Sequence, residues 1–264
     1  MGKTTKNLED KAFNFIRVAP RPAKPRNHGM TLVADRGVGM HAQEDLLQSA
    51  GDFVDMVKIG IGAFRLQTED FLKQKIDALH ANDVEVFFAG DLMEAAFLQG
   101  KSKELYKKVK ELGSDAVEVS SAQVSMSIDD KCRLIKMASD AGLKVVAEAG
   151  QKGHDNWTNS LSYINKQIEA YFEAGAWKTL IQGEGVSEGV EDRKEDLMLN
   201  IAAAFDVKDL IFQAKDGGTQ AFYVNTLGNI VNLDVDYDQV IDLELMRRNI
   251  RKHGLFGLVS SSGE

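Results

Sequence analysis

The stretch Ile135–Lys–Met–Ala–Ser–Asp–Ala–Gly–Leu–Lys–Val–Val–Ala–Glu–Ala–Gly150 joins the end of a helix to a buried strand. Ile135 and Ala138 lie three residues apart, which is typical of one face of a helix. Gly142 supplies the left-handed conformation that commonly ends helices. The nearly continuous apolar run after it, Lys144–Gly150, predicts a strand that is covered on both faces, as parallel strands are. The stretch therefore predicts one helix–strand unit of an α/β protein.

This unit repeats along the chain, because similar apolar runs begin 21 to 33 residues apart with amphipathic helical patterns between them. The runs are Met30–Asp35, Phe53–Gly60, Glu85–Gly90, Ala116–Ser121, Lys144–Gly150, Trp177–Gly183, Asp209–Lys215 and Ile230–Val235. Eight alternating units over residues 30–257 predict a single-domain α/β fold, the (β/α)8 TIM barrel. The alternative is a doubly wound open sheet, which usually carries a glycine fingerprint after its first strand. Gly37–Val–Gly39 lacks the third glycine of that fingerprint.

The two ends of the chain are predicted to lie outside the barrel. Residues 1–29 end in a basic, proline-rich run at 17–26, and proline disfavours helix in the residue before it. We expect an N-terminal extended arm that packs on the barrel or on a neighbouring subunit, although its basic character could also serve a ligand. Residues 258–264 are expected to form a C-terminal tail. Because barrels commonly self-associate, a homo-oligomer is expected.

Composition narrows the range of partners. The 264 residues contain 32 Lys and Arg against 40 Asp and Glu, a net charge of −8, which argues against binding to nucleic acid or to an anionic membrane. The single cysteine, Cys132, excludes an internal disulfide framework. No apolar stretch approaches the roughly 20 residues of a membrane span, and Met1–Asn14 lacks the apolar core of a secretory signal. We expect a cytoplasmic protein that acts on a small molecule.

Barrel enzymes place their chemistry at the carboxyl ends of the strands, and here nearly every predicted strand ends in an ionisable or amide side chain. These residues are Asp35, Arg36, Lys58, Asp91, Glu94, Glu118, Ser120, Glu148, Gln151, Lys152, Gln182, Glu184, Gln213, Lys215, Asn232 and Asp234. Any one of them could simply cap a helix or pair with a neighbour. Together, lysines and arginines that face carboxylates predict a site for a small anion. The carboxylate oxygens would also suit Mg²⁺.

A phosphate site is predicted at two glycine-containing segments. Lys215–Asp–Gly–Gly–Thr219 comes after the seventh strand and opens a helix, and Gly183–Glu–Gly185 comes after the sixth. Phosphates in barrels often bind to backbone N–H groups at such helix starts, here at Gly217 and Gly218. A Gly-Gly turn is also an ordinary loop.

Several of these segments resemble the phosphosulfolactate synthase family in the same order along the chain. They include Asp35–Arg–Gly37, Val57–Lys–Ile–Gly60, Ala116–Val–Glu–Val–Ser120, Glu148–Ala–Gly150 and the C-terminal run Val240–Ile–Asp–Leu–Glu–Leu–Met–Arg–Arg–Asn–Ile–Arg251. The resemblance extends from about Met30 to Gly257. It implies a (β/α)8 barrel and a lyase that adds sulfite to the methylene carbon of phosphoenolpyruvate with Mg²⁺.

The resemblance also implies roles for single residues. Asp35, Glu118 and Glu148 would bind the metal or orient lysines, and Lys152 would donate a proton. The implied catalytic residues are Lys152, Lys58, Glu118 and Glu148. Together with the strand-end pattern and the glycine turn, the predicted substrate-binding residues are Arg36, Ser120, Gln151, Gln182, Gln213, Lys215, Gly217, Gly218 and Asn232.

The chain departs from the family pattern at substrate-binding positions. Gln151 replaces a lysine, and Gln182 and Gln213 replace carboxylates. Two hypotheses result: a lyase that uses sulfite or another small nucleophile with phosphoenolpyruvate or a related enol or 2-oxo acid, or a weakly catalytic or non-catalytic, stress-associated homologue. A third hypothesis is an aldolase with a Schiff base on Lys58 or Lys152, which needs a lysine of lowered pKa.

Overall fold

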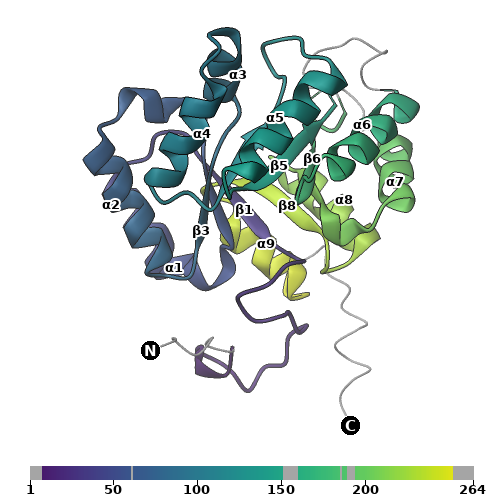
Figure 1. The fold of residues 1–264 in the computed structure, drawn as a ribbon. Coiled ribbons are helices and arrows are strands. Elements are labelled where there is room, and N and C mark those ends of the chain that lie inside the picture. Colours follow the sequence, from purple (N-terminus) through teal and green to yellow (C-terminus); the bar gives the residue numbers. More distant parts are fainter. Residues whose placement is uncertain (1–7, 61, 151–159, 185, 189–193, 252–264) are drawn as a thin grey trace.

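Eight parallel strands close into a barrel in sequence order, each hydrogen-bonded to the next and β8 to β1. The computed structural model describes residues 8–60, 62–150, 160–184, 186–188 and 194–251 (Figure 1). The strands are β1 Thr31–Asp35, β2 Met56–Ile59, β3 Glu85–Phe88, β4 Ala116–Val119, β5 Lys144–Ala149, β6 Lys178–Ile181, β7 Leu210–Gln213 and β8 Asn232–Asp236. The predicted single-domain (β/α)8 barrel is confirmed.

Helices form a ring around this barrel (Figure 1). They are α1 Met40–Ala50, α2 Glu69–His80, α3 Asp91–Leu98, α4 Ser102–Glu111, α5 Ile128–Asp140, α6 Leu161–Glu173, α7 Glu195–Ala204, α8 Gly217–Leu227 and α9 Val240–Arg247. Short 3₁₀ turns occur at Leu8–Asp10, Gly51–Phe53, Ala63–Leu66 and Val207–Asp209. Helix starts reflect local chemistry: the Thr68 hydroxyl caps α2 and the Ser127 hydroxyl caps α5. Within the described residues, no helix has the length and apolarity that crossing a bilayer requires.

The strands separate two cores, because successive side chains point to opposite faces. The outer core lies between strands and helices. The inner core fills the barrel with one buried apolar residue from each of β1 to β7: Leu32, Met56, Phe87, Ala116, Val146, Leu180 and Ile211. In β8 the residue in register with Leu32 is Asp234, which is fully buried. Residues two positions beyond the inner-core residues therefore also face the interior, near the carboxyl ends of the strands.

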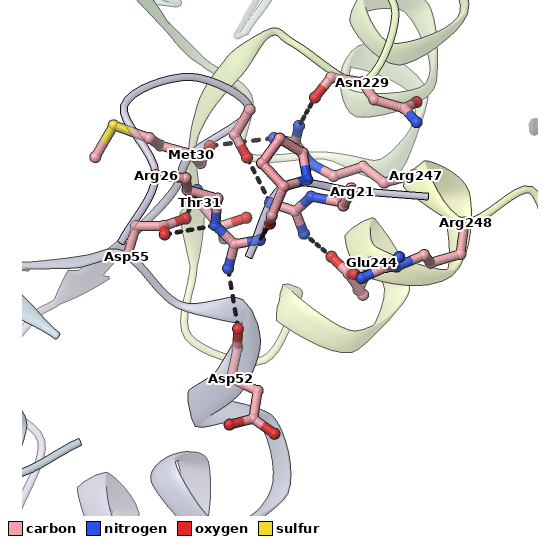
Figure 2. Close-up of polar contacts among 12 residues, drawn as sticks. Arg21, Arg26, Met30, Thr31, Asp52, Asp55, Asn229, Glu244, Arg247 and Arg248 are labelled. Atoms are coloured by element: carbon pink, nitrogen blue, oxygen red, sulfur yellow. Dashed lines mark hydrogen bonds and ion pairs between the residues drawn. The ribbon is translucent and has the colours of Figure 1, made fainter. Parts of the chain in front are cut away.

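The N-terminal arm is tied to the opposite, amino end of the same barrel (Figure 2). Arg21 pairs with Glu244 of α9, and Arg26 Nε lies 2.6 Å from Asp55 Oδ1 just before β2. Arg248 Nη1 donates to the carbonyl of Ala19 at 3.0 Å. The arm therefore packs on its own barrel, one of the arrangements expected from its sequence.

Arg247 lies next to Arg21 and binds backbone carbonyls at the amino end of the barrel (Figure 2). It donates to the carbonyls of Asn229, Val231 and Met30 at 2.8 to 3.1 Å, and its side chain is fully buried. Burial lowers the pKa of Arg247 to about 9. Burial, and after it repulsion from Arg247, lowers the pKa of Arg21 as well. We call Arg21, Arg26, Arg247 and Arg248 the arginine clamp.

Candidate active site

Lys58 occupies the carboxyl end of the barrel interior. Its Nζ lies 2.6 Å from Asp234 Oδ2 on β8 and 3.4 Å from Glu118 Oε2 on β4. Neither strand is a neighbour of β2, so both contacts cross the inside of the barrel. The three side chains are at most 12 % exposed. An ammonium group is thus held in a largely dry interior between two carboxylates.

The environment of Lys58 keeps this ammonium charged. Burial would lower the pKa of Lys58, but the carboxylates of Asp234 and Glu118 outweigh burial and raise the pKa above its ordinary value. A Schiff-base lysine needs the opposite shift. Lys58 is therefore suited to act as a fixed positive charge. It does not suit the Schiff-base role that the aldolase hypothesis requires.

A second lysine faces the other side of Asp234. Lys215 Nζ lies 2.7 Å from Asp234 Oδ1 and 3.6 Å from Asp236 Oδ1. Burial would raise the pKa of Asp234, but Lys215 and Lys58 together lower it, so this carboxylate is ionised. The half-exposed Arg36 side chain approaches Asp236 at 3.5 Å. Asp234 had no role assigned from sequence, although its place after an apolar run marked it as a strand-end residue.

Glu148 and two glutamines also face the barrel interior at this end, so that with Lys58, Glu118 and Asp234 they form a ring of interior side chains. In register, Glu118 pairs with Val146, so Glu148 lies two residues further along β5. Glu148 Oε2 accepts from Gln182 Nε2 at 3.2 Å, and Gln213 Oε1 accepts from the backbone of Gly183 at 3.2 Å. The structure thus brings together six of the predicted site residues: Lys58, Glu118, Glu148, Gln182, Gln213 and Lys215.

Just after β3, the chain approaches these side chains through Gly90, which has no side chain of its own. The backbone N–H of Gly90 donates to Glu118 Oε1 at 3.1 Å. A Cβ atom on Gly90 would lie 2.0 Å from Ser120 Oγ and 3.1 Å from Glu118 Oε1. Glycine is required here because backbone and carboxylate approach each other closely.

Ser120 points toward Glu94. Its hydroxyl donates to Glu94 Oε1 at 2.7 Å, and the Glu94 carboxylate also accepts from the backbone of Ala122, Gln123 and Val124. Both residues are buried. Ser120 therefore helps to anchor the loop after β4, and its predicted contact with substrate gains no support.

Asp35 requires a correction. Its Oδ2 lies 2.6 Å from Lys75 Nζ on α2, and its Oδ1 accepts from the backbone of Gly37 and Val38. Asp35 alternates with the inward-facing Ala34 and points into the helix layer, so its predicted place beside Glu118 and Glu148 as a metal ligand is wrong. Across the described part of the chain, no group of three His, Cys, Asp or Glu residues is arranged to hold a metal ion.

Asn232 was also predicted at the wrong end of the barrel. It is the first residue of β8, and its side chain accepts from the backbone of Met30 and donates to the carbonyls of Lys208 and Leu210. These bonds join β1, β7 and β8 at the amino end. The error arose because the strand begins two residues later than its apolar run.

The predicted phosphate cradle is occupied by the chain's own carboxylates. Asp216 Oδ1 accepts from the backbone N–H groups of Gly218 and Thr219, both at 2.9 Å. Glu188 Oε1 accepts from the backbone of Lys215 at 3.0 Å, and burial raises the pKa of Glu188. An anion at Gly217 and Gly218 would meet this negative charge, so the cradle prediction is not supported.

The predicted site residues Gln151 and Lys152 lie outside the residues that the structure describes. Lys131 of α5, in contrast, lies next to the site but was not among the residues predicted from the sequence. The side chain of Lys131 is fully buried, and its Nζ donates to the backbone carbonyl of Glu148 at 3.0 Å. Burial lowers the pKa of Lys131 to about 8, while the carboxylates of Glu148, Glu94 and Glu118 oppose the shift. A sequence signal was present, because Lys131 shares a helix face with Leu134, Ile135 and Ala138.

A closed (β/α)8 barrel with ionised side chains at the carboxyl ends of its strands has the construction of a barrel enzyme. The family described as (2R)-phospho-3-sulfolactate synthase (ComA) matches residues 19–253, and the chain belongs to this family. A phosphosulfolactate synthase of Methanothermobacter thermautotrophicus is 31 % identical over 249 residues, which cover 91 % of this chain and 96 % of that protein. Membership supports a lyase-type activity.

Two further similarities place the chain more broadly. The Arabidopsis thaliana protein HEAT-STRESS-ASSOCIATED 32 is 24 % identical over 260 residues, which cover 89 % of this chain and 91 % of that protein. The crystal structure of 3-hexulose-6-phosphate synthase from Salmonella typhimurium superposes with a TM-score of 0.57 at 15 % identity, covering 83 % of this chain and all of that one. This structural similarity shows the fold alone.

Proposed function

We propose that the chain adds sulfite, or another small nucleophile, to phosphoenolpyruvate or a related enol or 2-oxo acid. The observation that carries the proposal is the Lys58 ammonium group, fixed inside the barrel by Asp234 and Glu118 with Lys215 beyond Asp234. Family membership supports the same reaction class.

The reaction needs positive charge in one place and a proton in another. The sulfur lone pair forms a bond to C3, and the C2–C3 π electrons move toward the carboxylate to give a doubly charged aci-carboxylate. Lys58 would stabilise this developing charge as a preorganised cation. A proton then reaches C2 and completes the addition. The raised pKa of Lys58 makes it a poor proton donor, so this role falls to another group, and Lys152 is our candidate.

The residues present also fit a metal that arrives with substrate. Mg²⁺ is commonly held by one or two carboxylates together with substrate oxygens. Glu118 and Glu148 face the interior from neighbouring strands and would hold it. When bound, Mg²⁺ would supply additional positive charge to the carboxylate of the substrate. Arg36 at the rim would contact the outer anionic group.

The proposal is tested by incubating the purified chain with sulfite and phosphoenolpyruvate, with and without Mg²⁺, and detecting products by ³¹P NMR. We expect a new phosphorylated sulfonate from the wild type and none from Lys58→Met. Lys178→Met is the matched control, because Lys178 is also a buried lysine but donates to the carbonyl of Lys208 at the amino end. Absence of product with the wild type would refute this pair of substrates.

The second candidate function is that of a weakly catalytic or non-catalytic homologue. The observation that favours it is that backbone N–H groups at the ends of β6 and β7 are bonded to the chain's own Gln213, Glu188 and Asp216. Calorimetric titration separates the two candidates. Binding of phosphoenolpyruvate without turnover, or no binding at all, would favour this second function over the first.

A further inference from the structure

The carboxyl end of β5 is held from outside the barrel by two buried side chains. Lys131 of α5 donates from Nζ to the carbonyl of Glu148 at 3.0 Å. Gln167 of α6 accepts from the backbone N–H of Gly150 at 2.9 Å through its Oε1. Both are buried, Lys131 completely, and the Lys131 ammonium lies 5.3 Å from the centre of the Tyr171 ring. The two helices that pack on β5 therefore each contribute one polar group to the backbone at its end.

We propose that Lys131 is a positioning residue for the candidate active site, acting through the backbone of Glu148. This inference rests on the proposed function, because it assigns Lys131 to the same reaction. Lys131 lies in the helix layer while the Glu148 carboxylate faces Gln182 across the strands, so Lys131 fixes the orientation of Glu148 without contacting substrate.

The Lys131 bond lies close to a turn at the carboxyl end of β5. Gly150, two residues beyond Glu148, has a φ of 89°, a conformation that L side chains rarely adopt. The chain therefore turns sharply two residues after the carbonyl that Lys131 holds. A small displacement of reacting groups can lower turnover by as much as about 100-fold. Loss of the Lys131 bond should therefore affect the rate of reaction more than the binding of substrate.

Lys178 provides a matched control within the same barrel. Like Lys131, it is a buried lysine that donates from Nζ to a backbone carbonyl, here that of Lys208. It is the first residue of β6 and lies at the amino end, away from Lys58 and Glu148. Lys131→Met and Lys178→Met each remove one ammonium group and one bond to backbone, so a general loss of packing should affect both variants alike.

Amide hydrogen exchange tests the positioning step without requiring turnover. The reporters are the amides of Gly150, bonded to Gln167, and of Gln182, bonded to the carbonyl of Ala149. In Lys131→Met we expect both to exchange at least about tenfold faster, because local opening governs exchange. The amide of Trp177, bonded to Val145 at the amino end, should keep its rate. In Lys178→Met the amides of Gly150 and Gln182 should exchange at the wild-type rate.

Steady-state kinetics with sulfite and phosphoenolpyruvate give the functional readout. We expect Lys131→Met to lower kcat by about tenfold or more with KM changed less than about threefold, whereas Lys178→Met stays within about twofold of the wild type. Unchanged exchange at Gly150 and Gln182, or equal losses of kcat in both variants, would overturn the proposal. If the wild type itself forms no product, the proposed function fails, and the exchange rates alone decide whether Lys131 positions β5.

Discussion

Two buried cations, Lys58 at the carboxyl end of the barrel and Arg247 at the amino end, are held by different kinds of partner. At the carboxyl end, Lys58 and Lys215 face the carboxylates of Asp234 and Glu118. At the amino end, Arg21, Arg26 and Arg248 also have a carboxylate partner, Glu244 or Asp55, but Arg247 is bonded to three backbone carbonyls (Figure 2). Carbonyls neutralise no charge, which is why burial lowers the pKa of Arg247.

This difference separates a site from a scaffold. The planar guanidinium group has several donors in a fixed geometry and can join several backbone segments at once. An ammonium group between carboxylates carries a charge that is held in place before the substrate arrives, as electrostatic catalysis requires. Substitutions at the carboxyl end should therefore lower turnover, and substitutions at the amino end should lower stability.

The largest effect is expected at Lys58. Replacing it with Met removes the fixed cation, and we expect kcat with sulfite and phosphoenolpyruvate to fall about 1,000-fold, the size seen when one preorganised donor is lost. Asp234 keeps Lys215 as a partner, so the variant should remain folded. Steady-state kinetics and circular dichroism check both expectations. A folded variant with wild-type turnover would show that Lys58 has no part in the chemistry.

Arg247→Met should show the reverse behaviour. The substitution removes one donor from each of three backbone carbonyls, but the carbonyl of Met30 keeps its bond from the N–H of Leu233. Each unsatisfied buried group costs about 1 kcal/mol or more, so the carbonyls of Asn229 and Val231 give an expected loss of about 2 kcal/mol in the free energy of unfolding. Denaturant titration measures the loss. Arg251→Met is the control, because its pair with Asp242 is largely exposed and should contribute little.

Turnover per folded molecule should be unchanged in Arg247→Met at a temperature where the variant is fully folded. A loss of kcat comparable to that of Lys58→Met would show that the two ends of the barrel are coupled, and the separation of site from scaffold would be wrong.

Gly90→Ala should affect the carboxyl end through packing alone. The added Cβ would clash with Ser120 Oγ at 2.0 Å and press on Glu118, so we expect kcat to fall about tenfold or more because a reacting group is displaced. Gly39→Ala is the matched control, since a Cβ there has no neighbour within 4 Å. Equal kinetics for the two variants would mean that the loop around Ser120 yields without moving Glu118.

Much of the fold could be predicted because each strand is an apolar run and several helices end at a glycine. The boundaries were less certain, and at β8 a difference of two residues placed Asn232 at the wrong end. It was harder still to predict which residues of each strand point into the barrel. Parallel barrel strands are apolar on both sides, so the pattern does not show which residues point inward. Asp35 was misplaced for this reason, whereas Lys58 was placed correctly.

The partners of the site residues were beyond prediction for a related reason. Contacts such as Lys58 to Asp234 join distant segments, and their geometry depends on how far neighbouring strands are staggered. Local signals did exist for the glycine turn. Asp216 directly precedes a helix, where an aspartate usually caps the free N–H groups, and it does so here. The sequence before α8 therefore favours Asp216 as a helix cap over a phosphate site at Gly217 and Gly218.

The smallest expected effect concerns Asp234 and its response to acid. The pKa of Asp234 in the folded chain lies below the ordinary value of 3.8, so its two lysines stabilise the fold fully above that pH. This contribution is lost as the pH falls toward the folded-state pKa, because the unfolded chain then binds the proton first. Asp234→Asn cannot ionise and has no such contribution.

The difference between the wild type and Asp234→Asn separates the contribution of Asp234 to stability from that of all other carboxylates. We expect the difference in unfolding free energy between wild type and Asp234→Asn to be constant from pH 7 to about 5 and to shrink below about pH 4. Chemical denaturation at each pH gives the values. Arg247→Met should differ from the wild type by a nearly constant amount over the same range, because its lost bonds to carbonyls involve no carboxylate. A difference for Asp234→Asn that stays constant down to pH 3 would mean that Lys58 and Lys215 do not outweigh burial and that the pKa of Asp234 is not lowered in the folded chain, and the contrast between Lys58 and Arg247 would then lose its electrostatic basis.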